Sequence, residues 1–176
     1  MPLKKILLVT IFNLFSLSVI SQEEILATKI EALNTNCDKY LGFDNQKNTY
    51  SIKNNVLNKK SDTQSYQYNN LSLGIITKVD FQNPLEIVVF YKNFNTVVLI
   101  DNQLNEIRRI DYNMFSYPIN IEAHALSSQN QIWIYDSISS KIGLHNVNTG
   151  SIKWISTMLE NTIVYYESDY THFYWI

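Results

Sequence analysis

Residues 90–110 read FYKNFNTVVLIDNQLNEIRRI, and this stretch decides the fold. It contains three β-prone runs separated by turns rich in Asn and Asp, residues that accept a positive φ at little cost. The same pattern occurs near residues 43–58 and 134–152. Internal repetition at this spacing is typical of β-propeller blades, each of which is a small antiparallel sheet.

The repeat can be aligned residue by residue. In the later copy Tyr135 matches Tyr91 at an offset of 44 (135 minus 91), and the following apolar positions keep this offset. The earlier copy matches the central one at an offset of 47 (90 minus 43). The six pairs at that offset join Phe43, Asn48, Thr49, Asn55, Leu57 and Asn58 to Phe90, Asn95, Thr96, Asn102, Leu104 and Asn105.

A further β-prone run precedes each copy, at residues 28–33, 74–81 and 122–127. These runs supply a fourth strand for each unit. We therefore expect an all-β protein: a β-propeller-like arc of four-stranded antiparallel blades, with about three blades and the start of a fourth.

Two central runs, at residues 87–91 and 97–100, are apolar on both faces instead of alternating. Strands that are buried on both faces have this composition, as do the middle strands of a blade between two neighbours. A β-sandwich is the alternative fold, because its strands are also short and rich in turns. A sandwich does not require a fixed offset of 44 to 47 residues.

The first residues have the pattern of a signal peptide. Lys4 and Lys5 precede 15 mainly apolar residues, Ile6–Ile20, and a small side chain follows. We expect cleavage between Ser21 and Gln22, with export to the periplasm or beyond the cell. Because the apolar stretch is shorter than the roughly 20 residues of a membrane-spanning helix, no stable membrane span is expected after cleavage.

This cleavage divides the chain into a signal peptide, residues 1–21, and a propeller-like domain, residues 22–176. It changes the formal net charge from −2 to −4, because Lys4 and Lys5 are the only charged residues removed. The remaining basic residues form no stripe that could neutralise several phosphates, so no nucleic-acid partner is expected.

The single cysteine, Cys37, excludes an intrachain disulfide. We expect it to be a small buried or half-buried residue.

After Ile155 the sequence contains two more β-prone runs, at residues 161–166 and 172–176. They predict the first two strands of a fourth blade. We expect either that the sequence is a fragment of a longer product or that a second chain completes the arc. If the chain really ends at Ile176, unpaired apolar edges should make it self-associate.

No catalytic, cofactor-binding or metal-binding motif is found: no G-x-S-x-G, no clustered glycines before a helix, no H-E-x-x-H and no C-x-x-C. We therefore assign no catalytic residue, cofactor or metal ligand. Of the histidines His124, His145 and His172, only His124 could form a site at the propeller axis, with Asp80 one blade earlier. We expect all of them to be ordinary hydrogen-bonded residues near strand ends.

Two other groups of residues are of types that occur in catalytic or ligand-binding sites. The carboxylates Asp101, Asp111, Asp136 and Glu167 show no spacing that requires an acid–base pair. The C-terminal aromatic residues could stack on sugar rings, although we expect them to pack between strands. They are Tyr165, Tyr166, Tyr170, Phe173, Tyr174 and Trp175.

Over residues 28–176 the chain resembles secreted bacterial β-propellers of the NHL and quinoprotein-like kind, chiefly in residues 90–110 and 132–155. With its Ser21-Gln22 junction it also resembles uncharacterised exported propeller-like proteins of Bacteroidetes-type, Gram-negative bacteria. Residues 150–154, GSIKW, match the quinoprotein docking signature only in part, so quinone binding is not implied.

The expected function is that of a non-enzymatic, exported propeller module that binds a protein or glycan ligand, or acts as a scaffold, through the loops of one face. The alternative is an enzyme of the lyase or cyclotransferase kind, with an axial site largely outside this segment. The sequence does not indicate which ligand is bound, because propellers support many unrelated functions.

Overall fold

The computed structural model describes Thr28 and residues 35–176, and Thr35–Ile176 form one compact unit. The expected signal peptide with its Ser21-Gln22 junction lies outside the described residues, as does the expected strand at 28–33 apart from Thr28. Within the described part of the chain, no helix is both long and apolar enough to cross a membrane.

The strands form three four-stranded antiparallel sheets and one two-stranded sheet, each built from consecutive strands. Sheet 1 contains β1 (Lys39–Phe43), β2 (Thr49–Lys53), β3 (Val56–Lys60) and β4 (Ser65–Tyr68). Sheet 2 contains β5 (Lys78–Asp80), β6 (Ile87–Tyr91), β7 (Thr96–Ile100) and β8 (Glu106–Asp111). Sheet 3 contains β9 (Ile121–Leu126), β10 (Gln131–Asp136), β11 (Lys141–Asn146) and β12 (Ile152–Trp154). Sheet 4 contains β13 (Tyr166–Ser168) and β14 (Phe173–Trp175).

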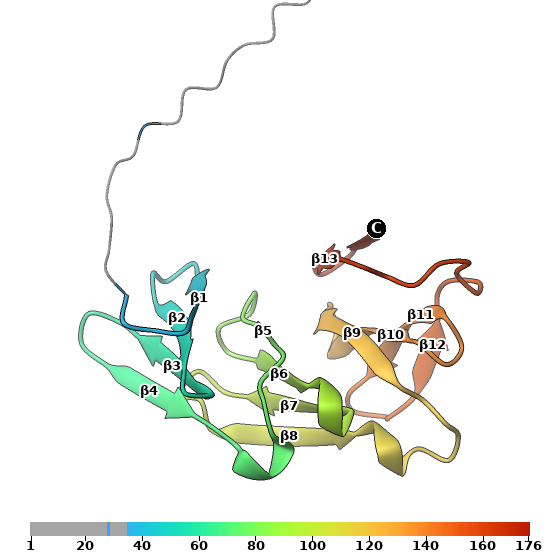
Figure 1. Ribbon diagram of the computed structural model, residues 1–176, viewed down its shortest axis with the longest axis horizontal. Coiled ribbons are helices and arrows are strands. Elements are labelled where there is room, and N and C mark those ends of the chain that lie inside the picture. The colour runs from blue at the N-terminus through green and yellow to red at the C-terminus, as the bar shows by residue number, and fades with distance from the viewer. Residues whose placement is uncertain (1–27, 29–34) are drawn as a thin grey trace, which may run out of the picture. The chain divides into compact units, whose positions relative to one another are not determined.

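The four sheets stand side by side in an arc, with the first strands β1, β5, β9 and β13 on its concave side (Figure 1). One apolar cluster fills each gap between neighbouring sheets. The expected fold class is confirmed: the protein is an all-β, propeller-like arc of three complete blades and two strands of a fourth. The described strands do not form a sandwich of two facing sheets.

Sheet 2 lies at the centre of the described blades. Every residue of β6 and β7 is buried, and alternate side chains enter opposite clusters. Val89 and Val98 pack toward sheet 1, whereas Phe90 and Val97 pack toward sheet 3. The prediction that these runs are buried on both faces is confirmed.

Sheet 1 differs, because its two faces have opposite polarity. The side toward sheet 2 carries Tyr50, Ile52 and Leu57, which belong to the first apolar cluster. On β2, β3 and β4 the outer face is polar apart from Val56, and presents Thr49, Ser51, Lys53, Asn58, Lys60, Ser65 and Gln67. At the edge of this face, β1 adds the exposed Tyr40 and Phe43, opposite Ser51 and Thr49.

Hydrogen bonds cross strands on this outer face: Gln67 donates to Asn58 Oδ1 (2.9 Å) and Thr49 donates to the carbonyl of Lys60 (3.2 Å). We call it the polar face of sheet 1. The expected self-association stays a prediction.

The structure tests the alignment of the repeat. The offset of 44 is confirmed, since Tyr91 and Tyr135 lie on second strands and Val98 and Ile142 on third strands. The offset of 47 is wrong by one strand, because Thr49 begins a second strand whereas Thr96 begins a third. Turns rich in Asn occur at several places in each blade, so an Asn-based match cannot distinguish neighbouring turns.

The true correspondence joins Asn55 and Asn95, which both precede third strands. Each adopts a left-handed conformation, with φ of 62° and 49°. The Asn95 amide donates to the carbonyl of Ile119 (2.8 Å) and accepts from Ile121 N–H (2.9 Å). Asn55 makes the same pair of bonds to Gly74 and Ile76 (2.7 and 2.8 Å). Each amide therefore binds the backbone that leads into the next sheet, and we call this arrangement the Asn clamp.

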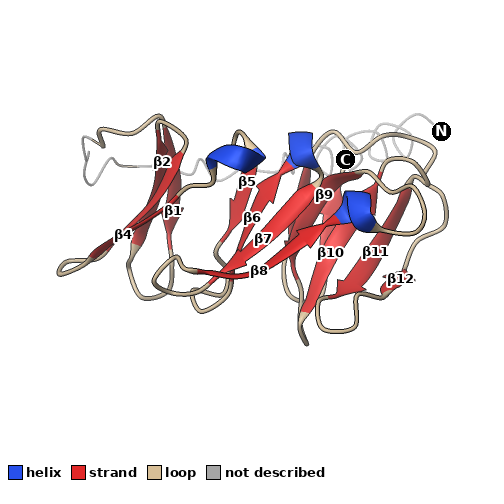
Figure 2. Ribbon diagram, turned by 90° about the horizontal axis from the view of Figure 1, so that it is seen from below, coloured by secondary structure: helices blue, strands red, loops and turns tan. Residues whose placement is uncertain are grey.

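The loops divide into two sets by the end of the sheets at which they lie. Because each complete blade has four antiparallel strands, all first strands begin at the same end. That end, the helical-turn end, carries the three short 3-10 turns at Leu71–Leu73, Lys92–Phe94 and Tyr112–Met114, which lie along one edge of the row (Figure 2). The opposite end, the hairpin end, carries the turns that join first to second strands and third to fourth strands.

Candidate functional site

A hollow of the described unit lies where the first strands converge. It has a volume of about 530 Å³ and is lined by residues of β1, β5, β9 and β13 and of the loops that follow β1 and β5. This is the concave side of the arc (Figure 1). A volume of this size falls within the range of roughly 300–1,000 Å³ that is usual for small-ligand sites. We call it the axial hollow.

Two lysines mark the helical-turn end of the axial hollow. Lys39 is the first residue of β1 and Lys78 is the first residue of β5, and both line the hollow. The ammonium of Lys78 lies 3.6 Å from the centre of the Tyr166 ring, a cation–π contact. Burial lowers the pKa of Lys78, while Glu167 and Asp80 oppose this change and Lys39 adds to it.

Asp44 and Asp80 lie at the hairpin end of the hollow. The carboxylate oxygens of both accept hydrogen bonds from the protein itself. Asp44 accepts from the backbone N–H groups of Gln46 and Asn48, from the Asn48 amide and from the Tyr50 hydroxyl, all at 2.9–3.0 Å. Burial by itself would raise the pKa of Asp44, but these hydrogen bonds outweigh it and lower the pKa. A carboxylate has about four lone-pair sites, so Asp44 has none left for a ligand.

Asp80 is similarly occupied. It accepts from the backbone and amide of Gln82 (3.0 and 3.2 Å) and from Leu126 N–H (2.7 Å). The bond to Leu126 joins β5 of sheet 2 to β9 of sheet 3. Asp80 therefore fixes two neighbouring first strands beside the hollow.

Aromatic side chains form part of the wall. Tyr40 and Phe43 are 47% and 69% exposed, and Phe81 stacks on the buried Tyr50 ring with a centroid distance of 4.4 Å. The register of β1 shifts between Tyr40 and Gly42, and Gly42 has a φ of +132°, which side-chain-bearing residues rarely adopt. Such bulges redirect side chains at the edge of a site.

The structure places the predicted pair His124 and Asp80 on neighbouring first strands, but no hydrogen bond joins them within the described residues. His124 is fully buried and stacks on Phe90, with ring centroids 4.5 Å apart. Neither ring nitrogen has a hydrogen-bond partner among the described residues. The expectation of an ordinary hydrogen-bonded residue near a strand end is wrong for His124, because it is a buried mid-strand residue that lacks such partners. Burial, with a smaller contribution from Lys78, lowers its pKa to about 3.

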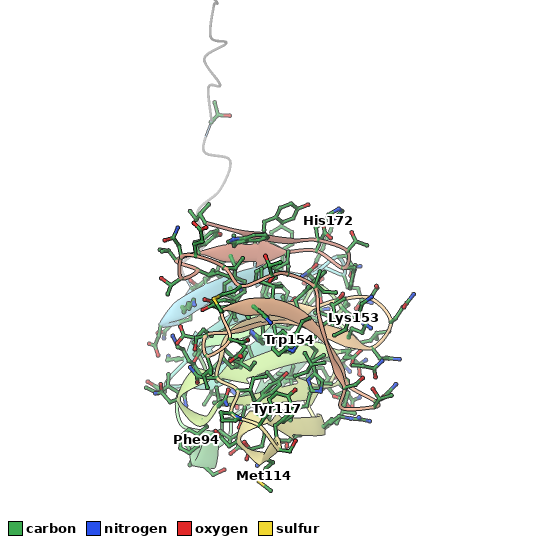
Figure 3. The ribbon with its side chains drawn as sticks, turned by 90° about the vertical axis from the view of Figure 1, so that its right-hand side faces the viewer. Phe94, Met114, Tyr117, Lys153, Trp154 and His172 are labelled. Carbon is green, nitrogen blue, oxygen red and sulfur yellow. The ribbon has the colours of Figure 1, made fainter. Side chains whose placement is uncertain are left out.

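The other two histidines lie elsewhere. His145 is near the end of β11, where its Nδ1 shares a hydrogen bond of 2.9 Å with the Tyr112 hydroxyl, and burial lowers its pKa to about 4. His172 lies in the turn of sheet 4, at the edge of the protein (Figure 3). Within residues 35–176 no three His, Cys, Asp or Glu side chains gather as metal ligands would.

Three of the four carboxylates noted in the sequence shape turns. Asp101, Asp111 and Asp136 each accept backbone N–H groups within three or four residues, at 2.8–3.1 Å. Glu167 is different, because it lines the axial hollow, where it accepts a hydrogen bond from the Tyr165 hydroxyl (2.7 Å).

The C-terminal aromatic residues follow the packing expectation only in part. Phe173 is buried and stacks with Tyr166, at a centroid distance of 5.4 Å. The other four are more than 40% exposed: Tyr165, Tyr170, Tyr174 and Trp175. Cys37 is partly buried, as expected, and its thiol lies 3.4 Å from Thr35 Oγ1.

Comparison with solved structures finds similar chains at low sequence identity. The structure is similar to virginiamycin B lyase from Staphylococcus aureus, with a TM-score of 0.49 and 11% identity over 70% of this chain and 42% of that chain. It is also similar to apo AztD from Citrobacter koseri, with a TM-score of 0.49 and 13% identity over 75% of this chain and 38% of that chain. The chain thus spans less than half the length of either protein. No protein-family model matches the sequence, and no curated protein matches it either.

Proposed function

We propose that this protein is a binding module that holds a glycan in the axial hollow, without catalysing a reaction on it. The observation that carries the proposal is the composition of the hollow. Each sheet contributes its first strand, and the wall combines exposed aromatic rings with polar side chains. Sugar rings present apolar C–H faces and many hydroxyl groups, so they fit a site of this mixed kind.

The polar groups available to such a ligand lie on different first strands or on the turns beside them. Asn45 and Ser168 line the hollow, and no side-chain hydrogen bond within the described unit occupies either of them. The proposal also includes export, as the first 21 residues predict. A protein ligand, bound through the same loops, is the other form of the binding function that the sequence suggested.

We expect Tyr40→Ala and Phe43→Ala to weaken glycan binding about tenfold each, because each removes an exposed ring from the wall. Binding of neutral and acidic oligosaccharides to the full chain would be measured by isothermal titration calorimetry. The matched control is Tyr117→Ala, since Tyr117 is 44% exposed, close to the 47% of Tyr40, but lies outside the hollow. Equal affinities for all three variants and the unaltered chain would contradict a glycan site in the hollow.

An enzyme of the lyase or cyclotransferase kind is the second candidate. One observation favours it: burial lowers the pKa of the Lys78 ammonium, which lies against the Tyr166 ring at the axis. A lysine of this kind can act as a base. Conversion of a bound oligosaccharide into a product, lost in Lys78→Gln, would support this candidate over the binding module.

A further inference from the structure

We propose that the glycan is acidic, and that its anionic group binds between Lys39 and Lys78 at the helical-turn end of the axial hollow. This inference rests on the proposed function and specifies the ligand of the same site. The shared chemistry is a sugar that carries a carboxylate or sulfate group.

The first argument is the lack of a counter-ion. Within the described residues, the only ion pairs with oxygen and nitrogen atoms within 4.0 Å are Lys92–Glu122, Arg109–Glu106 and His172–Asp169. Neither lysine of the hollow belongs to them. The face of the Tyr166 ring lies against the Lys78 ammonium, and within the described residues no side-chain hydrogen bond engages this ammonium.

The second argument is the state of the nearby carboxylates. Asp44 and Asp80 accept four and three hydrogen bonds from the protein itself. Glu167 accepts from Tyr165 and stays more than 4 Å from both ammonium groups. The two lysines thus have no ion-pair partner within 4.0 Å among the described residues, and Glu167 and Asp80 act on Lys78 only from a greater distance.

The third argument is electrostatic. Lys39 and Lys78 start adjacent first strands. Burial lowers the pKa of Lys78, and the like charge of Lys39 adds to this change, against the opposing effects of Glu167 and Asp80. An anion between them would remove this repulsion and would form charge-assisted hydrogen bonds, which are about twice as strong as neutral ones. The exposed rings of Tyr40 and Phe43 remain available for the sugar itself.

The test measures binding of three oligosaccharides of equal length to the full chain: an oligogalacturonate, a sulfated galactose oligomer and a neutral galactose oligomer. We expect at least one acidic oligomer to bind about tenfold or more tightly than the neutral one, and more weakly as salt increases. Lys78→Gln and Lys39→Gln should each weaken the acidic complex about tenfold, and Lys78→Arg should retain most of the affinity. The acidic oligomer that binds more tightly identifies the anionic group as a carboxylate or a sulfate.

The matched controls are Lys53→Gln and Lys60→Gln, which make the same charge change on the polar face of sheet 1. These control variants should change the affinity for the acidic oligomer by no more than about twofold. This result would distinguish a local effect of Lys39 and Lys78 from an effect of the net charge of the protein. Equal binding of neutral and acidic oligomers, unaffected by Lys39→Gln and Lys78→Gln, would overturn the acidic ligand and leave the glycan module standing. Failure of all three oligomers to bind the unaltered chain would overturn both.

Discussion

The variant Asn95→Ala is expected to lower the free energy of unfolding by on the order of 3–5 kcal/mol. It removes an Asn clamp and leaves the Ile121 N–H and the Ile119 carbonyl without their partner, although both residues are at most 5% exposed. Each buried backbone group left unsatisfied costs roughly 1–3 kcal/mol. Alanine would also have to adopt the φ of 49° that Asn95 has. Such a loss is a large part of the total stability of a typical domain.

Urea unfolding, followed by circular dichroism, measures this effect. The matched control is Asn54→Ala, because Asn54 has the same φ of 49° but is exposed. The Asn54 side chain makes no hydrogen bond within the described unit, so only the backbone strain applies, at about 1 kcal/mol. Asn95→Gly relieves the strain but still removes the clamp, and should remain strongly destabilising. If Asn95→Ala costs no more than Asn54→Ala, the clamp does not hold the sheets together.

The second large effect is acid destabilisation by two buried histidines. Burial lowers the pKa of His124 to about 3 and of His145 to about 4, so both are neutral in the folded protein at pH 5–7. In the unfolded chain each binds a proton below about pH 6.5. The stability that they contribute is complete above this pH and decreases as the pH falls toward 4 and then 3. Each histidine adds a slope of up to about 1.4 kcal/mol per pH unit, so the loss between pH 7.5 and 5 is on the order of 4 kcal/mol.

Urea unfolding at several pH values between 5 and 7.5 tests this prediction. In this window the aspartates with lowered pKa values remain ionised in both states and contribute little. His124→Phe should reduce the slope by about half, because a phenyl ring can stack on Phe90 without titrating. His172→Gln is the control, since this histidine is 64% exposed at its side chain. A stability that does not change between pH 5 and 7.5 would mean that the buried histidines become protonated without unfolding.

The repeat predicted the fold because strands that are buried on both faces have a recognisable apolar composition. The runs at 87–91 and 97–100 are apolar on both faces, and such strands require a neighbour on each side. The alignment of the first blade failed for a local reason. Asn55 is the second residue of a tight two-residue turn, whereas Asn95 ends a 3-10 turn, so the loops differ in length although the two side chains make equivalent hydrogen bonds.

The axial hollow could not be predicted from the sequence in the same way. Each sheet contributes one short strand, so Lys39, Lys78 and Glu167 come together from distant positions with no motif at fixed spacing. The candidate pair His124 and Asp80 was located on the correct strands, because the repeat indicates which strands are innermost. Their roles depend on neighbours, Phe90 for His124 and Leu126 for Asp80, which only the packing of adjacent sheets reveals.

The polar face of sheet 1 has a consequence for the design of longer arrays. A sheet stacked on this face would have to strip water from Lys53 and Lys60 without offering them partners, and burying unpaired charges is costly. A copy of the central blade placed against the polar face of sheet 1 would therefore not bind to it. Lengthening the array on that side would first require apolar residues in place of the lysines and amides.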